Sequence, residues 1–145
     1  MSFSEQEIAY LRSQRLARIA TVGADGQPDV APVGFEFDGT HLLVGGFNPA
    51  RTRKFRNVAA GNAKIAIVID DLPSVQPWTP RYLRVYGDAQ IVQRQGPRGP
   101  APVMRIMPRV SWSYNLDGLP FSHDREVSVR RTVHTTGPAD GPPQD

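Results

Sequence analysis

Cysteine is absent from this chain of 145 residues, and lysine is scarce, because only Lys54 and Lys64 occur among the 17 basic residues. The lack of cysteine excludes a disulfide framework, a thiolate nucleophile and any metal site with cysteine ligands. No apolar run approaches the length of a membrane-spanning helix. The first ten residues, MSFSEQEIAY, lack the basic and apolar regions of a signal peptide. We therefore expect a soluble, cytoplasmic protein that does not act at a membrane.

Side chains that carry acid, base or metal chemistry are also few. Asp70 and Asp71 are neighbours at the end of an apolar run, and neighbours in a strand point to opposite faces. Ser111 and Ser113 have no histidine close to them in sequence, which argues against a hydrolase. The three histidines show none of the spacings of a metal site: His41, His123 and His134. We predict no metal, and we expect any redox chemistry to come from a bound cofactor.

The formal net charge is only +3, although the pI is about 9.7. A charge this small does not by itself indicate nucleic acid, and solvated surface residues can account for it. Arginine dominates the basic residues, and its planar guanidinium favours bidentate partners such as carboxylate and phosphate. A nucleic-acid-binding barrel remains our last-ranked hypothesis. It would need aromatic residues for base stacking, and only Phe55 lies within the most basic segment.

The order of the predicted elements favours a mainly β fold with peripheral helices. Ser4 and Glu7 form a capping box that opens a helix over residues 5–14, and Phe3 and Ile8 stand at the staple positions. Pro32 lies inside a predicted strand, which implies an edge, a bulge or a ligand-facing position. The predicted strands are residues 16–23, 29–37, 40–46, 63–70, 81–92, 109–116 and, last, 126–134. Six or seven short strands joined by tight turns indicate an antiparallel barrel or sandwich.

Individual segments lead to more detailed expectations. The continuous apolar run AKIAIVID, residues 63–70, predicts a strand buried on both faces. Residues 71–80 and 95–102 are predicted loops. Trp112 is expected in the core, because large aromatic side chains are mostly buried. Residues 1–134 form one predicted domain, and residues 135–145 are too polar and too rich in Pro and Gly to fold alone. A barrel this small fills its own interior, so a ligand would sit in an outer groove or at a subunit interface.

The segment NPARTRKFRNV, residues 48–58, concentrates positive charge where a second helix is expected to begin. Asn48 is the predicted N-cap, Pro49 the first helical residue and Gly61 the C′ glycine. Cations oppose the helix dipole at this end, unless an anion binds between them and the free N–H groups. The basic residues of this segment are Arg51, Arg53, Lys54 and Arg56. Composition alone leaves two interpretations open: a phosphate site or a solvated basic face.

Five segments in sequence order resemble the pyridoxamine 5′-phosphate oxidase-like flavin and deazaflavin oxidoreductases. They are LARIATVGADGQPDVAPVGFEFDGTHLLVGG, TRKFRNV, AKIAIVID, RYLRVYGDAQIV and RIMPRVSWSYNLDG, and the resemblance covers roughly residues 15–118. Lys54, Arg56 and Asn57 match a K-x-R-N segment of that family, and the last segment looks like the ending of a subgroup of short members. The "R-x-H" substrate motif of the vitamin-B6 oxidases is missing. This absence argues against pyridoxamine phosphate as the substrate.

The resemblance implies a split β-barrel homodimer with two cofactors in grooves at the interface. Short members of this kind often use the deazaflavin coenzyme F-420 instead of FMN. The resemblance also implies roles for individual residues of this sequence. The cofactor phosphate or ribityl chain would be held by Thr52, Lys54 and Asn57, and the ring would lie beside Pro32 and Val33. Trp78 could close the site from the partner chain. Four further residues complete the predicted cofactor-binding set: Asn48, Arg51, Arg53 and Arg109, of which Arg109 could reach an acidic cofactor tail or remain solvated.

Our leading hypothesis is a deazaflavin-dependent reductase that transfers hydride to an unsaturated small molecule such as an enone, a quinone or a polyketide-type substrate. A second hypothesis keeps the fold and exchanges the cofactor for FMN. A third is a non-catalytic carrier that binds flavin or deazaflavin tightly without turnover. The protonating group is left open between solvent, Tyr86 and Tyr114.

Overall fold

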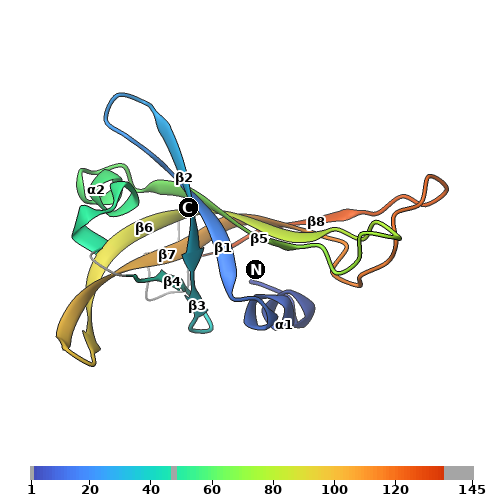
Figure 1. Cartoon of the computed structure of the whole chain (residues 1–145), viewed down its shortest axis with the longest axis horizontal. Helices are drawn as coiled ribbons and strands as arrows, with labels where there is room; N and C mark the ends of the chain where they lie inside the picture. Colours follow the sequence, from blue (N-terminus) through green and yellow to red (C-terminus); the bar gives the residue numbers. More distant parts are fainter. Residues whose placement is uncertain (1, 47–48, 136–145) are drawn as a thin grey trace.

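The computed structural model describes residues 2–46 and 49–135 of the chain. Its elements are, in order, α1 (Glu5–Ser13), β1 (Leu16–Val22), β2 (Pro28–Gly34), β3 (Glu36–Phe37), β4 (Leu42–Val44), the 3-10 turn η1 (Pro49–Arg51), α2 (Arg53–Ala59), β5 (Lys64–Asp71), β6 (Arg81–Gly96), β7 (Gly99–Tyr114) and β8 (Val129–Val133). The predicted mainly β, antiparallel fold with helices at its rim is confirmed (Figure 1).

The strands form one curled sheet in the order β2-β1-β5-β6-β7-β4-β3, with β8 paired to β7. All strand pairs are antiparallel. The sheet has eight strands where six or seven were predicted, because the run 29–37 is divided at Phe35 into β2 and β3. Within the sheet β2 pairs only with β1, so Pro32 lies in an edge strand, as its missing N–H requires.

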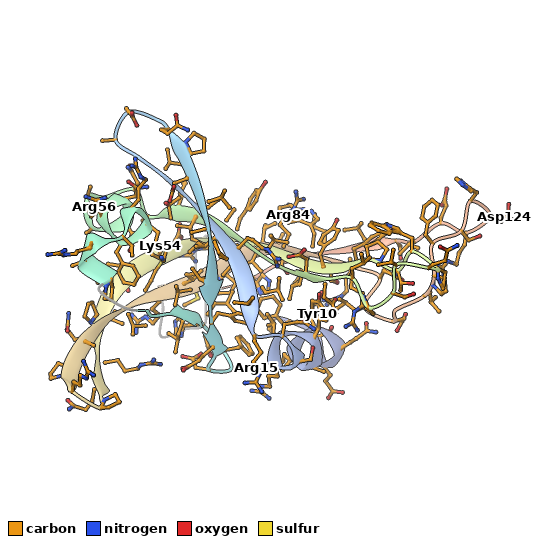
Figure 2. All side chains as sticks on the ribbon, viewed as in Figure 1. Tyr10, Arg15, Lys54, Arg56, Arg84 and Asp124 are labelled. Carbon is orange, nitrogen blue, oxygen red and sulfur yellow. The ribbon has the colours of Figure 1, made fainter. Side chains whose placement is uncertain are left out.

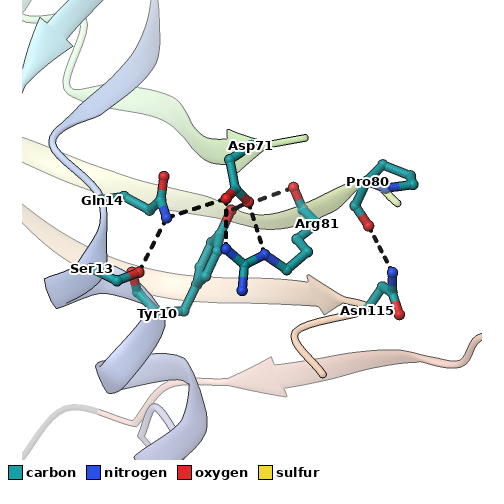
Figure 3. Close-up of polar contacts among 7 residues, drawn as sticks. All are labelled: Tyr10, Ser13, Gln14, Asp71, Pro80, Arg81 and Asn115. Carbon is teal, nitrogen blue, oxygen red and sulfur yellow. Dashed lines mark hydrogen bonds and ion pairs between the residues drawn. The ribbon is translucent and has the colours of Figure 1, made fainter. Parts of the chain in front are cut away.

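Helix α1 begins with the predicted capping box, in which the Ser4 hydroxyl accepts from the Glu7 N–H and the Glu7 carboxylate accepts from the Ser4 N–H. Figure 3 shows how α1 is fastened to the sheet. The Tyr10 hydroxyl donates to Asp71 at 2.8 Å, and Arg81 Nη2 donates to the same carboxylate at 2.6 Å. Hydrogen bonds from Arg81 hold the pKa of Asp71 below its usual value, and burial raises the pKa of Tyr10.

Strands β6 and β7 are much longer than predicted. Each has 16 residues, and the predicted loop 95–102 is the end of a hairpin whose turn is Pro97-Arg98. Proline and glycine in that segment suggested a loop, yet the two strands remain paired up to Gly96 and Gly99. The pairing register shifts between Tyr86 and Gly87, where the hairpin bends. A Cβ at Gly87 would lie 2.7 Å from the Met107 carbonyl oxygen, so no larger residue fits there without movement.

The two faces of the sheet have different surroundings. The core face carries Ile65, Ile67 and Ile69, which are at most 5% exposed. The opposite face, which we call the open face, carries Ala66 and Val68, both only half-buried in this chain. The prediction that strand 63–70 is buried on both faces is therefore wrong for the chain by itself. Trp112 was also expected in the core, but it lies on the open face, since Ser111 and Ser113 occupy the buried positions beside it.

Within residues 2–46 and 49–135, no helix is both long and apolar enough to cross a membrane. In the same part of the chain no group of three or more His, Asp or Glu side chains could hold a metal ion. The predicted N-cap Asn48 and the tail residues 136–145 lie outside the described residues.

Candidate functional site

Helix α2 begins later than the sequence suggested. Its N-cap is Thr52, whose extended backbone (φ −85°, ψ 147°) separates the helix from the 3-10 turn Pro49–Arg51. The Thr52 hydroxyl donates to the Pro49 carbonyl at 2.7 Å, so it makes no cap hydrogen bond to α2. The prediction of one helix starting at Pro49 is wrong, because the Thr52 N–H and hydroxyl both close the preceding turn. Gly61, with φ +108°, follows the C-cap Ala60 as predicted.

A small pocket of about 170 Å³ lies between the start of α2 and the ends of β2 and β4. Four of the predicted cofactor-binding residues line it together: Pro32, Val33, Thr52 and Lys54. Gly34, Gly45 and Gly46 form much of the remaining wall, and within residues 2–46 and 49–135 no atom would contact a Cβ placed at Gly45 or Gly46. Gly46 also has φ +143°, a conformation that other residues rarely adopt. The backbone at this wall is therefore open to close approach by a ligand.

A second hollow of about 340 Å³ shares these three glycines with the small pocket. Phe35 and Leu43 line it, together with Glu36 and Arg94, whose side chains form an ion pair at 2.7 Å. We call the two hollows together the glycine groove. The groove provides a narrow cationic end at Lys54 and a wider continuation along β3 and β4.

Lys54 is the only one of the basic-segment cations among the residues that line the small pocket. Arg56, two residues further along α2, instead lines a separate apolar hollow with Ile91 and Pro102. Figure 2 labels both side chains at the α2 end of the molecule. Among the described residues, none of the four cations of the segment forms an ion pair: Arg51, Arg53, Lys54 and Arg56. The segment thus has positive charge without a carboxylate to neutralise it, as an anion site requires.

Asn57 does not reach the glycine groove. It is buried, and its Nδ2 donates to Thr21 Oγ1 at 2.9 Å. The hydrogen bond ties α2 to β1, so Asn57 supports the helix that carries Lys54. A cofactor contact by Asn57 stays a prediction, with the amide nitrogen already engaged.

Arg109 belongs to a different cavity of about 590 Å³ on the open face. Its Nε lies 2.5 Å from Asp88 Oδ2, so the side chain is ion-paired. Tyr86, which is 48% exposed, forms another part of the wall. Apart from Thr21 and Lys64, the remaining lining is apolar: Ala20, Val22, Pro28, Ile65, Ala66, Gly87 and Val110.

Trp78 is 52% exposed in the loop between β5 and β6. Its carbonyl accepts a hydrogen bond from the Phe121 N–H at 2.7 Å. Figure 1 shows this loop at the end of the molecule opposite α2. Within one chain, therefore, Trp78 and Lys54 are not brought together.

One polar pair was missed from the sequence. The Ser111 hydroxyl lies 2.8 Å from His134 Nε2, because β8 pairs with β7 and brings together residues 23 positions apart. Ser111 is fully buried, however, so its oxygen cannot attack a substrate. The strand alternation around Ser111 could have shown its burial, but only the pairing of β8 identifies its partner.

The chain is similar to known proteins in both sequence and fold. The profile of the pyridoxamine 5′-phosphate oxidase family matches residues 3–124. A curated relative from Streptomyces rimosus, the 5a,11a-dehydrotetracycline/5a,11a-dehydrooxytetracycline reductase, is 39% identical over 138 residues, which cover 89% of this chain and 96% of the relative. A solved structure described as an F-420 reductase matches with a TM-score of 0.59 at 22% identity, over 75% of this chain and 98% of the other. The heme storage protein of Vibrio cholerae matches with a TM-score of 0.56 at 15% identity, over 75% of this chain and 92% of the other. At such identities the two structures share the fold with this chain.

Proposed function

This chain belongs to the pyridoxamine 5′-phosphate oxidase family, and from that premise we propose that it is a deazaflavin-dependent reductase of an unsaturated small molecule. The observation that carries the proposal is the small pocket that Thr52 and Lys54 line together with Pro32, Val33 and three glycines. The two pairs are separated by about 20 residues in sequence, yet they line one hollow, as the predicted cofactor contacts require.

The pocket fits the phosphate end of such a cofactor. Lys54 offers a charge without a carboxylate partner among the described residues, and α2 has no side-chain cap at its first turn. A volume of about 170 Å³ is below the usual range for a whole ligand, roughly 300–1,000 Å³, but suits one phosphate group. When bound, a deazaflavin or a flavin supplies the hydride.

The chain's own residues have binding and orienting roles in this proposal. Lys54 holds the phosphate, and Thr52, whose hydroxyl and N–H both donate to the Pro49 carbonyl, shapes the pocket beside it. Pro32 and Val33 limit the position of the ring. The absence of side chains at Gly45 and Gly46 admits the cofactor close to the backbone. No strongly basic or nucleophilic side chain is needed, because the protein orients the reactants at near-attack distance.

We further propose that the protein acts as a homodimer whose second copy covers the open face. The exposed large apolar residues on this face include Val22, Val30 and Tyr86, which are 40%, 68% and 48% exposed. A contiguous apolar surface of this kind on a sheet marks an interaction site. In such a dimer, Trp78, which lies at the end of its own chain opposite α2, would contact the glycine groove of the other subunit.

The substrate class follows from the relative that is 39% identical, a reductase of dehydrotetracyclines by its name. We propose a polycyclic or quinone-like compound with a conjugated double bond. The preference for the deazaflavin over FMN rests on the resemblance to the short members of the family. FMN, as the second candidate, would use the same phosphate pocket.

The test is a fluorescence titration of the purified protein with coenzyme F-420 and, separately, with FMN. We expect saturable binding of the deazaflavin and at least tenfold weaker binding of FMN. The reverse preference would assign the protein to FMN. If neither cofactor binds, the reductase proposal fails, and the basic segment needs a different anion. Turnover of a quinone by the reduced holoenzyme then separates a reductase from a non-catalytic carrier.

A further inference from the structure

We propose that Arg84, Trp112 and Tyr86 form a recognition site on the open face for a planar aromatic substrate that carries a negative charge. Describing the ligand as a substrate rests on the proposed function. The binding site itself can be tested without any cofactor. Its ligand class is a fused-ring carboxylate, phenolate or enolate.

The three side chains are arranged as one cluster. The Arg84 guanidinium carbon lies 4.3 Å from the centre of the Trp112 ring and 5.6 Å from the centre of the Tyr86 ring. The Tyr86 and Trp112 rings are 4.8 Å apart at 71°, edge to face. A guanidinium stacked on an aromatic ring keeps its N–H groups in the plane, where they can donate to an oxygen anion. In Figure 2, Arg84 projects from the side of the sheet opposite to α1 and Tyr10.

The charges around Trp112 are not balanced. Its cross-strand neighbours are Arg84 on β6 and Arg131 on β8, so two cations flank one ring. Neither arginine forms an ion pair with any of the described residues. The carboxylates on the same face are already engaged, Asp70 with Arg18 at 2.6 Å and Asp88 with Arg109 at 2.5 Å.

A second copy of the chain does not remove this imbalance. In a symmetric dimer through the open face, the partner presents the same two arginines and the same engaged carboxylates. Aliphatic residues such as Val30 and Val68 can be covered by the partner, whereas Arg84 and Arg131 still require an anion. A bound small molecule is therefore a better occupant than the partner's own side chains.

Space for such a molecule adjoins the cluster. Tyr86 and Val110 belong both to the neighbourhood of Trp112 and to the wall of the 590 Å³ cavity. That volume lies within the range of small-molecule sites, roughly 300–1,000 Å³. Its apolar walls suit flat rings, and Arg84 lies outside the lining but next to Tyr86, which forms part of the wall. The cavity shares no lining residue with the phosphate pocket, so the two sites can be occupied together.

The experiment measures binding of two probes of equal shape, anthraquinone-2-carboxylate and the neutral anthraquinone-2-carboxamide. The chain has two tryptophans, so in the Trp78→Phe background the fluorescence quenching reports on Trp112 alone. We compare this protein with versions that also carry Arg84→Gln, Arg84→Lys or the control Arg98→Gln. Arg98 lies exposed in the turn of the β6–β7 hairpin and has no ion pair among the described residues.

We expect the carboxylate to bind about tenfold or more tightly than the amide, the size of a charge-assisted hydrogen bond. Arg84→Gln should abolish the preference, Arg84→Lys should restore only part of it, and Arg98→Gln should leave it unchanged. Equal affinities for the two probes would overturn the proposal, and so would an equal loss in Arg98→Gln. Arg84→Gln made in the chain that keeps Trp78 should bind coenzyme F-420 with the affinity of the wild type. A parallel loss there would assign Arg84 to the cofactor and overturn the inference.

The two proposals can fail separately. A protein that discriminates the probes but binds neither cofactor retains this site and loses the proposed function. A protein that binds a cofactor but does not discriminate the probes retains the function and loses this site.

Discussion

Asn57 on α2 donates a hydrogen bond of 2.9 Å to Thr21 on β1, and both side chains are buried. The bond joins the helix that carries Lys54 to the sheet. Replacing Thr21 by Val keeps the shape and leaves the amide of Asn57 without its acceptor. We expect Thr21→Val to lower the free energy of unfolding by about 1–3 kcal/mol, measured by urea denaturation.

The matched control is Thr132→Val. Thr132 is equally buried, at 3% exposure, and its Oγ1 has no hydrogen-bond partner in the described part of the chain. The same substitution there should be neutral or slightly stabilising, since it removes a buried hydroxyl that makes no bond. Equal losses at the two positions would show that the Asn57–Thr21 bond contributes nothing specific.

Lys54→Ala should weaken binding of the cofactor by about 1.5–3 kcal/mol, because it removes a charge-assisted hydrogen bond to the phosphate. The free energy of unfolding should hardly change, since Lys54 has no ion-pair partner among the described residues. Affinity is measured by the same fluorescence titration as for the wild type. Arg56→Ala is the control, because Arg56 is a cation of the same helix that lines a different hollow. An unaltered affinity in Lys54→Ala removes this residue from the site.

Val30→Asp should dissociate the proposed dimer. Val30 is 68% exposed in one chain, so its replacement should not disturb the monomer fold. Burying an unpaired carboxylate in the interface should weaken association by about 3 kcal/mol or more. Sedimentation velocity measures the result, and Ala101→Asp, at an exposed position near the hairpin end, is the control. A Val30→Asp protein that remains dimeric at micromolar concentration would place the interface elsewhere.

The contribution of Asp71 to stability should depend on pH. Arg81 holds the pKa of Asp71 below the ordinary 3.8, so this carboxylate stabilises the folded state fully above that value. The stabilisation is lost as the pH falls through the lower pKa of the folded state. Asp71→Asn should therefore cost about 1–3 kcal/mol at pH 7, and the difference from wild type should shrink below pH 3.8.

Urea denaturation at pH 7, 5 and 3 measures this dependence. Asp70→Asn is the control, because the Asp70–Arg18 ion pair is more exposed, with side chains 44% and 46% accessible. Its cost should stay below about 1 kcal/mol. A difference between wild type and Asp71→Asn that stays constant down to pH 3 contradicts the role of the Arg81 hydrogen bonds.

Local signals in the sequence were sufficient for several elements. The capping box Ser4–Glu7, the edge position of Pro32 and the C′ glycine Gly61 each depend on the chemistry of a few neighbouring residues, and the structure has all three. The Pro- and Gly-rich segment 95–102 was misleading, because pairing across the β6–β7 hairpin overrides the loop preference of those residues. Trp112 was misplaced for a related reason: its large side chain suggested burial, but the strand alternation puts Ser111 and Ser113 in the core.

The candidate site was predictable in composition but not in geometry. The resemblance implied that Thr52 and Lys54 hold the cofactor phosphate or ribityl chain, and both residues line the small pocket. Sequence alone could not show that the Asn57 amide donates a hydrogen bond to Thr21, since the two residues are 36 positions apart. Nor could it show that Arg84 and Arg131 flank Trp112, because this arrangement depends on the registers of two strand pairs.

Gly87 has two roles that are inseparable. It stands at the register shift that bends the β6–β7 hairpin, and it also lines the 590 Å³ cavity. One small residue therefore serves both the register shift of the sheet and the surface of the cavity. A larger residue there would place its Cβ 2.7 Å from the Met107 carbonyl oxygen and 2.8 Å from the Ile106 side chain, so the hairpin would have to shift. The neighbouring walls, such as Tyr86 and Val110, are positions where the cavity can be altered without this clash at residue 87.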